Sequence, residues 1–171
     1  MTTTTSDEYS VIGKRPVRHD GVDKVTGKAL YGADMNLPGM LYGKMLRSPH
    51  AHARIRSIDI SKALSHPGIK AVVTSDDLVP LPDKNAEVGE DLYANMKYVR
   101  DRILASDKAL FRGHPIAAVA ASSLHEAEEL LSLIEVEYEI LEPVTDVEAA
   151  IEKNAPILHD SIASFSLGDN N

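Results

Sequence analysis

The chain has 171 residues and a formal net charge of −8, and its 43% hydrophobic and 26% charged residues match an ordinary globular domain. It contains no cysteine, which excludes a disulfide framework, a thiolate zinc site, a cysteine-ligated iron–sulfur cluster and a cysteine nucleophile. No apolar run approaches the roughly 20 residues of a membrane helix, and the start of the chain lacks the features of a signal peptide, so we expect a cytoplasmic protein with no membrane span. Because the net charge is negative, we expect no nucleic-acid partner.

The N-terminal part carries no periodic apolar pattern. Residues 1–10 are polar and predict a disordered tail. Residues 11–40 contain turn sequences such as His19-Asp20-Gly21 and Leu37-Pro38-Gly39, which predict an ordered but irregular segment. A stretch of this length with little regular structure normally lies against something larger.

Residues 41–77 predict short strands around one short helix. The runs 41–47 (LYGKMLR) and 53–60 (ARIRSIDI) predict strands, and the second loses its alternation near Ser57, which indicates a bulge. Ser61 is expected to cap a helix over residues 62–64. A buried strand follows over 69–74 (IKAVVT), and a helical turn can begin at Ser75.

Residues 79–102 differ from the segments on either side. Prolines stand at positions 80 and 82, the charges are scattered, and no apolar period is sustained. We therefore predict a long loop with a helical turn near residues 93–98.

The last third is the most regular part. Residues 116–121 (IAAVAA) predict a buried strand of small side chains, and Ser123 with Glu126 predicts a capping box at the start of an amphipathic helix. Residues 134–141 (IEVEYEIL) alternate strictly, as a strand with one solvated face does, and a last short helix follows between Thr145 and Ile151. Together these elements predict the α+β class, a two-layer domain with a mixed, largely antiparallel sheet.

The charges divide unevenly along the chain. Residues 1–74 carry 11 Lys and Arg against 6 Asp and Glu, whereas residues 75–171 carry 7 against 20. Two explanations remain open: two halves that fold onto each other, or an acidic face that meets a basic partner.

His50 and His52 could both face a metal ion from one side of a strand, because they stand two residues apart. No third ligand stands at a suitable spacing, and metal sites usually need three or four ligands. We therefore expect a turn after Ser48-Pro49 whose histidines make ordinary hydrogen bonds.

His114 lies between a glycine and a proline. We expect a surface turn residue there, with a side chain aimed at a partner or substrate as the alternative. The row of Glu135, Glu137 and Glu139 is better explained as a solvated strand face than as a general acid–base pair. The residues alone show no complete active site.

Several sequence blocks occur in an order and spacing that resemble a known domain. They are DGVDKVTGKALY at 20–31, LPGML at 37–41, LRSPHAHARI at 46–55, PGIKAVVT at 67–74, FRGHPIAAV at 111–119 and IEVEYE at 134–139. Together they resemble the N-terminal α/β hammerhead domain of the molybdenum hydroxylase large subunit. That family includes xanthine dehydrogenases, aldehyde oxidases, aerobic carbon monoxide dehydrogenases and hydroxybenzoyl-CoA reductases.

The resemblance implies an oxidoreductase component. In such enzymes a molybdenum centre carried by a pterin hydroxylates an aldehyde or N-heterocycle with oxygen from water, a glutamate acts as general base, and electrons pass through iron–sulfur clusters to a flavin. The pterin-binding segments and the glutamate of the family lie in the region that follows this domain. The resemblance therefore assigns no catalytic, cofactor-binding or metal-ligating residue here, and it implies molybdopterin, iron–sulfur clusters and FAD for the intact complex.

The resemblance also implies a domain organisation. Residues 11–151 form the hammerhead domain after the tail of residues 1–10, and residues 152–171 form an extension leading towards an absent cofactor-binding region. Such a chain would be an excised piece of a longer protein, a piece prepared for crystallisation or a split-gene subunit.

The expected function is a non-catalytic structural and assembly domain, inactive alone. It would pack against the molybdopterin-binding region of the large subunit and border the iron–sulfur and flavin subunits or domains. The candidate interface residues lie in two turns: Arg47, Ser48, Pro49, His50, Gly113, His114 and Pro115. The alternative is a stand-alone protein-interaction module that keeps the fold without serving a molybdenum enzyme.

Overall fold

The computed structural model describes residues 9–89 and 92–160, and the chain divides into two compact units, Met1–Pro38 and Gly39–Asn171. The first unit contains helix α1 (Gly21–Val25) and the 3₁₀ turn η1 (Gly32–Asp34), neither with a buried residue. All but two residues of the predicted tail lie outside the described residues. None of the described helices is long and apolar enough to cross a membrane.

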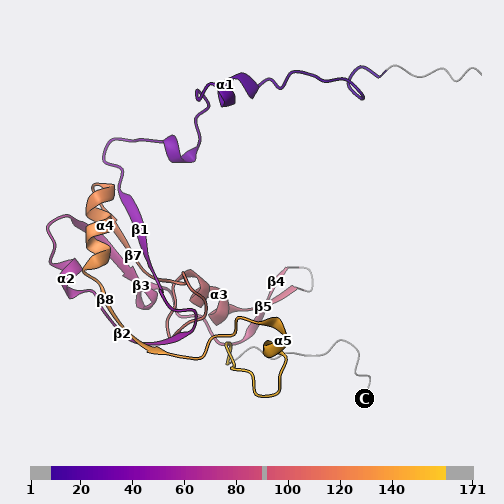
Figure 1. Cartoon of the computed structure of the whole chain (residues 1–171). Coiled ribbons are helices and arrows are strands. Elements are labelled where there is room, and N and C mark those ends of the chain that lie inside the picture. Colours follow the sequence, from indigo (N-terminus) through magenta and orange to yellow (C-terminus); the bar gives the residue numbers. More distant parts are fainter. Residues whose placement is uncertain (1–8, 90–91, 161–171) are drawn as a thin grey trace, which may run out of the picture. The chain divides into compact units, whose positions relative to one another are not determined.

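The second unit contains a three-stranded antiparallel sheet in the order β1-β7-β3 (Figure 1). These strands are β1 (Tyr42–Arg47), β7 (Pro115–Ala121) and β3 (Ile69–Thr74), all predicted from their apolar runs. Helices α2 (Ser61–Leu64) and α4 (Leu124–Ser132) lie on one face of this sheet. β3 is less buried than predicted, because Ala71 on its other side is exposed.

The larger core cluster fills the space between this sheet and α4. Ala117, Val119 and Ala121 of β7 pack there with Leu130, and the alanines allow the helix to lie close to the strand. The hydroxyl of Ser123 accepts a hydrogen bond from the N–H of Glu126 at 3.2 Å, which confirms the predicted cap of α4.

A second antiparallel sheet has the order β6-β2-β8. It is formed by β6 (Lys108–Ala109), β2 (Ala53–Asp59) and β8 (Glu135–Ile140). The register between β2 and β8 shifts between Ile55 and Ser57, which confirms the predicted bulge. Ile116 of β7 joins a smaller core cluster against Ile55 and Tyr138 of this sheet.

The predicted long loop over residues 79–102 is wrong. The structure places there a hairpin of β4 (Asn85–Gly89) and β5 (Leu92–Asn95), followed by helix α3 (Met96–Ile103). The side chain of Asn95 accepts a hydrogen bond from the N–H of Tyr98 at 3.0 Å and begins the helix. α3 has no buried residue: Met96, Val99 and Ile103 stand at helical spacing, but Val99 is 42% and Ile103 is 54% exposed.

The predicted α+β class with a two-layer arrangement is confirmed, and every strand pairing of the described residues is antiparallel. The predicted helical turn after β3 is the 3₁₀ turn η2 (Ser75–Asp77), and the predicted last helix is α5 (Val147–Ala150). The predicted Ser61 cap is wrong, because α2 begins at Ser61 and its N–H donates to the Asp59 carboxylate at 2.9 Å. The domain boundaries at residues 10/11 and 151/152 stay predictions.

Candidate functional site

The two predicted interface turns lie side by side, although 66 positions separate Arg47 from Gly113. The N–H of Ser48 donates to the carbonyl of His114 at 2.9 Å, and the N–H of Gly113 donates to the carbonyl of Ser48 at 2.8 Å. Arg47 also donates from Nη1 to the Gly113 carbonyl at 2.9 Å. Antiparallel pairing of β1 with β7 brings them together, with Arg47 opposite Pro115. All seven predicted residues therefore belong to one local structure, which we call the paired turns.

Ser48 organises the first of the paired turns from the inside. Only 2% of Ser48 is exposed, and its hydroxyl accepts the N–H of His50 at 3.1 Å and lies 2.9 Å from the His50 carbonyl. The His50 ring packs edge-on against Tyr138, with the ring centroids 5.1 Å apart. Burial raises the pKa of the Tyr138 hydroxyl, and a hydrogen bond with Ser48 opposes that effect.

His114 is fully buried, so the predicted surface turn residue is wrong. The Leu110 N–H donates to its Nδ1 at 3.2 Å, and its Nε2 lies 2.8 Å from the Asp101 carbonyl. Since a carbonyl can only accept, Nε2 carries the ring proton and the imidazole is neutral. The ring also stacks on Phe111 with centroids 4.5 Å apart, and burial lowers the pKa of His114. The alternative of a side chain aimed at a ligand is wrong as well, because both ring nitrogens bind the main chain.

His50 and His52 do not converge on one point. His52 is 4% exposed, and its Nδ1 lies 2.7 Å from the Glu142 carbonyl, whereas the His50 ring contacts Tyr138. The expected hydrogen bond is present at Nδ1 of His52, whereas its buried Nε2 has no hydrogen-bond partner among the described residues and the His50 ring makes an aromatic contact instead. In residues 9–89 and 92–160, no three His, Asp or Glu side chains are grouped to hold a metal ion.

The predicted glutamate row lies on the solvated face of β8, and two of its three members pair with basic residues. Glu139 forms an ion pair with Arg56, Glu135 forms one with Lys62, and Glu137 accepts a hydrogen bond from Ser57 at 3.4 Å. The hydrogen bond and charge of Glu135 raise the pKa of Lys62. The explanation of this row as a solvated strand face is therefore confirmed.

Ion pairs also join the basic first half of the chain to the acidic second half. Besides the contacts of Glu135 and Glu139, Lys44 on β1 lies 2.9 Å from the Glu128 carboxylate on α4. These contacts support the explanation that the two halves fold onto each other. The alternative of an acidic face for a basic partner stays a hypothesis.

A polar cavity of about 110 Å³ lies beside α3, and the sequence pattern gave no sign of it. Its charged groups pair with one another, since Lys97 lies 2.8 Å from Asp101 and Lys108 lies 2.7 Å from Asp160. The first ion pair lies within α3, and the second links Lys108 of β6 to Asp160. The sequence did not indicate this cavity, because α3 lies where a loop was predicted.

The exposed groups at the paired turns are few. Arg47, Pro49 and Arg112 are exposed, and Phe111 is 44% exposed. A guanidinium recognises a carboxylate through paired hydrogen bonds, and an aromatic ring contributes apolar contact area. This arrangement can bind a protein surface.

Comparisons with known proteins point to one family. Residues 26–142 match the family model described as aldehyde oxidase and xanthine dehydrogenase, a/b hammerhead domain. The carbon monoxide dehydrogenase large chain of Afipia carboxidovorans is 40% identical over 95% of this chain and 19% of its own length. A probable xanthine dehydrogenase component of Bacillus subtilis is 42% identical over 90% of this chain and 20% of its own length.

Solved structures give the same result. A Cu,Mo-CO dehydrogenase superposes with a TM-score of 0.71 at 34% identity, over 93% of this chain and 19% of that chain. Quinoline 2-oxidoreductase from Pseudomonas putida 86 superposes with a TM-score of 0.73 at 37% identity, over 88% and 19%. This chain therefore spans about a fifth of the length of these relatives.

Proposed function

The chain belongs to the aldehyde oxidase and xanthine dehydrogenase family, and on that premise we propose that it is the structural and assembly domain of a molybdenum hydroxylase. It contains the hammerhead domain of that family, and the bond-making steps take place on other parts of the enzyme. One observation carries this proposal: contacts within the domain occupy both imidazoles of the predicted interface turns. Both ring nitrogens of His114 bind the main chain, and the His50 ring packs on Tyr138.

The cofactors implied by the family are molybdopterin, iron–sulfur clusters and FAD. This chain has no cysteine to hold an iron–sulfur cluster, and its described residues contain no group of three metal-binding side chains. The proposal therefore assigns these cofactors to the partners: the molybdopterin-binding region of the large subunit and the iron–sulfur and flavin subunits or domains. A cytoplasmic location stays a prediction from the sequence.

The paired turns are the proposed interface with these partners. Arg47, Pro49 and His50 present side chains outward or at half-buried positions, whereas Ser48 and His114 are buried and act from inside. Hydrogen bonds between Ser48, Gly113 and His114 hold the two turns together before any partner binds. A preorganised surface of this kind loses little conformational freedom on assembly.

Isolation of the chain from its source cells with its natural partners tests the proposal. A tagged chain is purified under native conditions, and the molybdenum, iron and flavin of the complex are quantified. The proposal expects molybdenum, iron and flavin to copurify with the chain, and Arg47→Ala to reduce that recovery relative to an exposed control such as Lys153→Ala. A chain that copurifies with other proteins and no molybdenum would support the stand-alone interaction module instead.

A further inference from the structure

The β1-β7-β3 sheet has one covered and one bare face in the described part of the second unit. On the covered face, Ala117, Val119 and Ala121 of β7 pack against α4. Side chains alternate along a strand, so the neighbours of these residues point to the other face. Figure 1 shows both α2 and α4 on the same side of this sheet.

The bare face is made of small and apolar residues, which we call the open face. Its members are Gly43, Met45, Ala71, Val73, Ala118 and Ala120. They form two rows across the three strands, since Gly43 and Ala71 pair with Ala120, and Met45 and Val73 pair with Ala118. Not one of the six carries a charge, and the exposed bulge residue Lys70 borders them beside Ala71.

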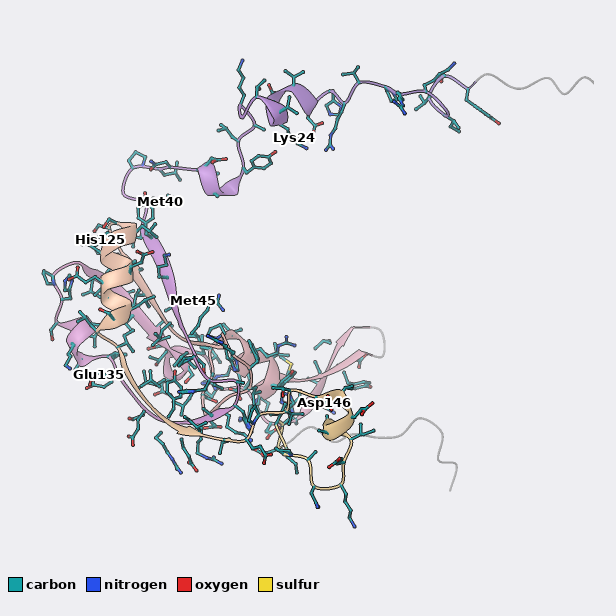
Figure 2. The ribbon with its side chains drawn as sticks, in the orientation of Figure 1. Lys24, Met40, Met45, His125, Glu135 and Asp146 are labelled. Atoms are coloured by element: carbon teal, nitrogen blue, oxygen red, sulfur yellow. The ribbon has the colours of Figure 1, made fainter. Side chains whose placement is uncertain are left out.

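The open face is accessible within the described part of the second unit. Met45 is 44% exposed, Gly43 and Ala71 are exposed, and the other three members are half-buried. Figure 2 shows Met45 on the side of β1 away from α4. Glycine and alanine leave the backbone close to the surface, so a helix or strand can approach this face closely. Contiguous apolar surface of this kind marks an interaction site.

The open face continues into the paired turns. Gly43, Met45 and Arg47 alternate along β1 and share one side of the strand. The Sδ of Met45 lies 3.9 Å from Nη2 of Arg47, and Nη1 of Arg47 is bonded to the Gly113 carbonyl. The surface is therefore apolar between two basic residues, Arg47 at the paired turns and Lys70 at the bulge of β3.

We propose that the open face is the docking surface for an apolar segment of the cofactor-binding region of the large subunit. A carboxylate of that segment would pair with Arg47. This inference rests on the proposed function and specifies which surface performs the assembly role. Two observations select the occupant. The matched part is 19% and 20% of two curated relatives, so most of such a protein is available to cover it. Arg47 stands where the apolar rows meet the paired turns, and an anionic group at that end of an apolar segment would complement its charge.

Oxidation of Met45 by hydrogen peroxide reports directly on this surface, because a covered thioether reacts slowly. The rate is measured by peptide mass spectrometry in the chain alone and in the intact enzyme, with free methionine as the dose reference. The proposal expects Met45 to react about ten-fold more slowly in the intact enzyme. Equal rates would overturn it. Protection that appears in the chain alone as its concentration rises would identify a second copy as the occupant and would also overturn it.

A pair of substitutions provides the second arm. Met45→Glu places a charge on the open face, and Val88→Glu places one on the hairpin at a position that is 50% exposed. Both variants should keep the thermal midpoint of the chain alone, and only Met45→Glu should reduce recovery of assembled enzyme, by about ten-fold. Equal recovery would overturn the proposal while the assembly role stands. A native chain that never copurifies with molybdenum would overturn the proposed function, and this inference with it.

Discussion

Replacing His114 by alanine tests whether this histidine is structural. The change removes a ring that is fully buried, and it leaves the Leu110 N–H and the Asp101 carbonyl without their partners. Each buried group left unpaired costs about 1–3 kcal/mol, and the lost ring leaves a cavity beside Phe111, so we expect the free energy of unfolding to fall by about 3–5 kcal/mol.

Urea unfolding of the 171-residue chain measures this loss. His125→Ala is the matched control, because His125 is exposed on α4 and its replacement should change the free energy of unfolding by no more than about 0.5 kcal/mol. His114→Gln retains an amide and should recover part of the loss. If His114→Ala is no more destabilising than His125→Ala, the buried hydrogen bonds assigned to His114 are refuted.

Three further predictions concern stability. Ser123→Ala removes the cap of α4 and should lower the free energy of unfolding in urea by about 1 kcal/mol. Ser122→Ala, at the exposed preceding position, should change it little. Equal effects of the two substitutions would contradict the capping role of Ser123. Gly113→Ala forces alanine to φ +91° and should lower the free energy of unfolding by about 1–3 kcal/mol. Gly32→Ala is the control, because Gly32 has no positive φ and open space around it. Equal thermal midpoints of the two variants would show that the φ of Gly113 imposes no strain. Burial lowers the pKa of His114, so this histidine takes up a proton at a higher pH in the unfolded chain than in the folded one. The free energy of unfolding should therefore decrease as the pH falls from about 7 to 5. His114→Gln removes the titrating ring and should make this pH dependence weaker.

The sequence was most informative where one strand or helix face decides burial. β8 has strict alternation, and its predicted wet face carries Glu135, Glu137 and Glu139 in the structure. The bulge in β2 was also predictable, because an extra residue breaks a period of two and is visible in a single segment.

The misassigned parts depend on contacts between distant segments. α3 carries a short apolar series of Met96, Val99 and Ile103, and none of the three is buried. Among the described residues, the preceding hairpin pairs only within itself. His114 looked exposed because it stands between Gly113 and Pro115, residues typical of surface turns. Its burial follows from the position of residues 101–110, whose main chain occupies both ring nitrogens. The contacts of His114 therefore become visible only in the folded chain.

The candidate interface was predictable as two separate turns and not as one surface. The family resemblance selected residues 47–50 and 113–115, and the pairing of β1 with β7 joins them. The apolar rows of the open face could not be predicted from the sequence, because they depend on the register of three strands that are not consecutive in the chain. Residue patterns indicate which side chains share a face only within one strand.

Turnover by the purified 171-residue chain is the most direct test of the claim that it shapes an enzyme without making or breaking bonds. The chain is incubated with aldehydes and N-heterocycles and an artificial electron acceptor, and product formation and bound molybdenum are measured together. We expect no hydroxylated product and no stoichiometric molybdenum. Hydroxylation by this chain alone, or molybdenum held by it in a one-to-one ratio, would contradict the account.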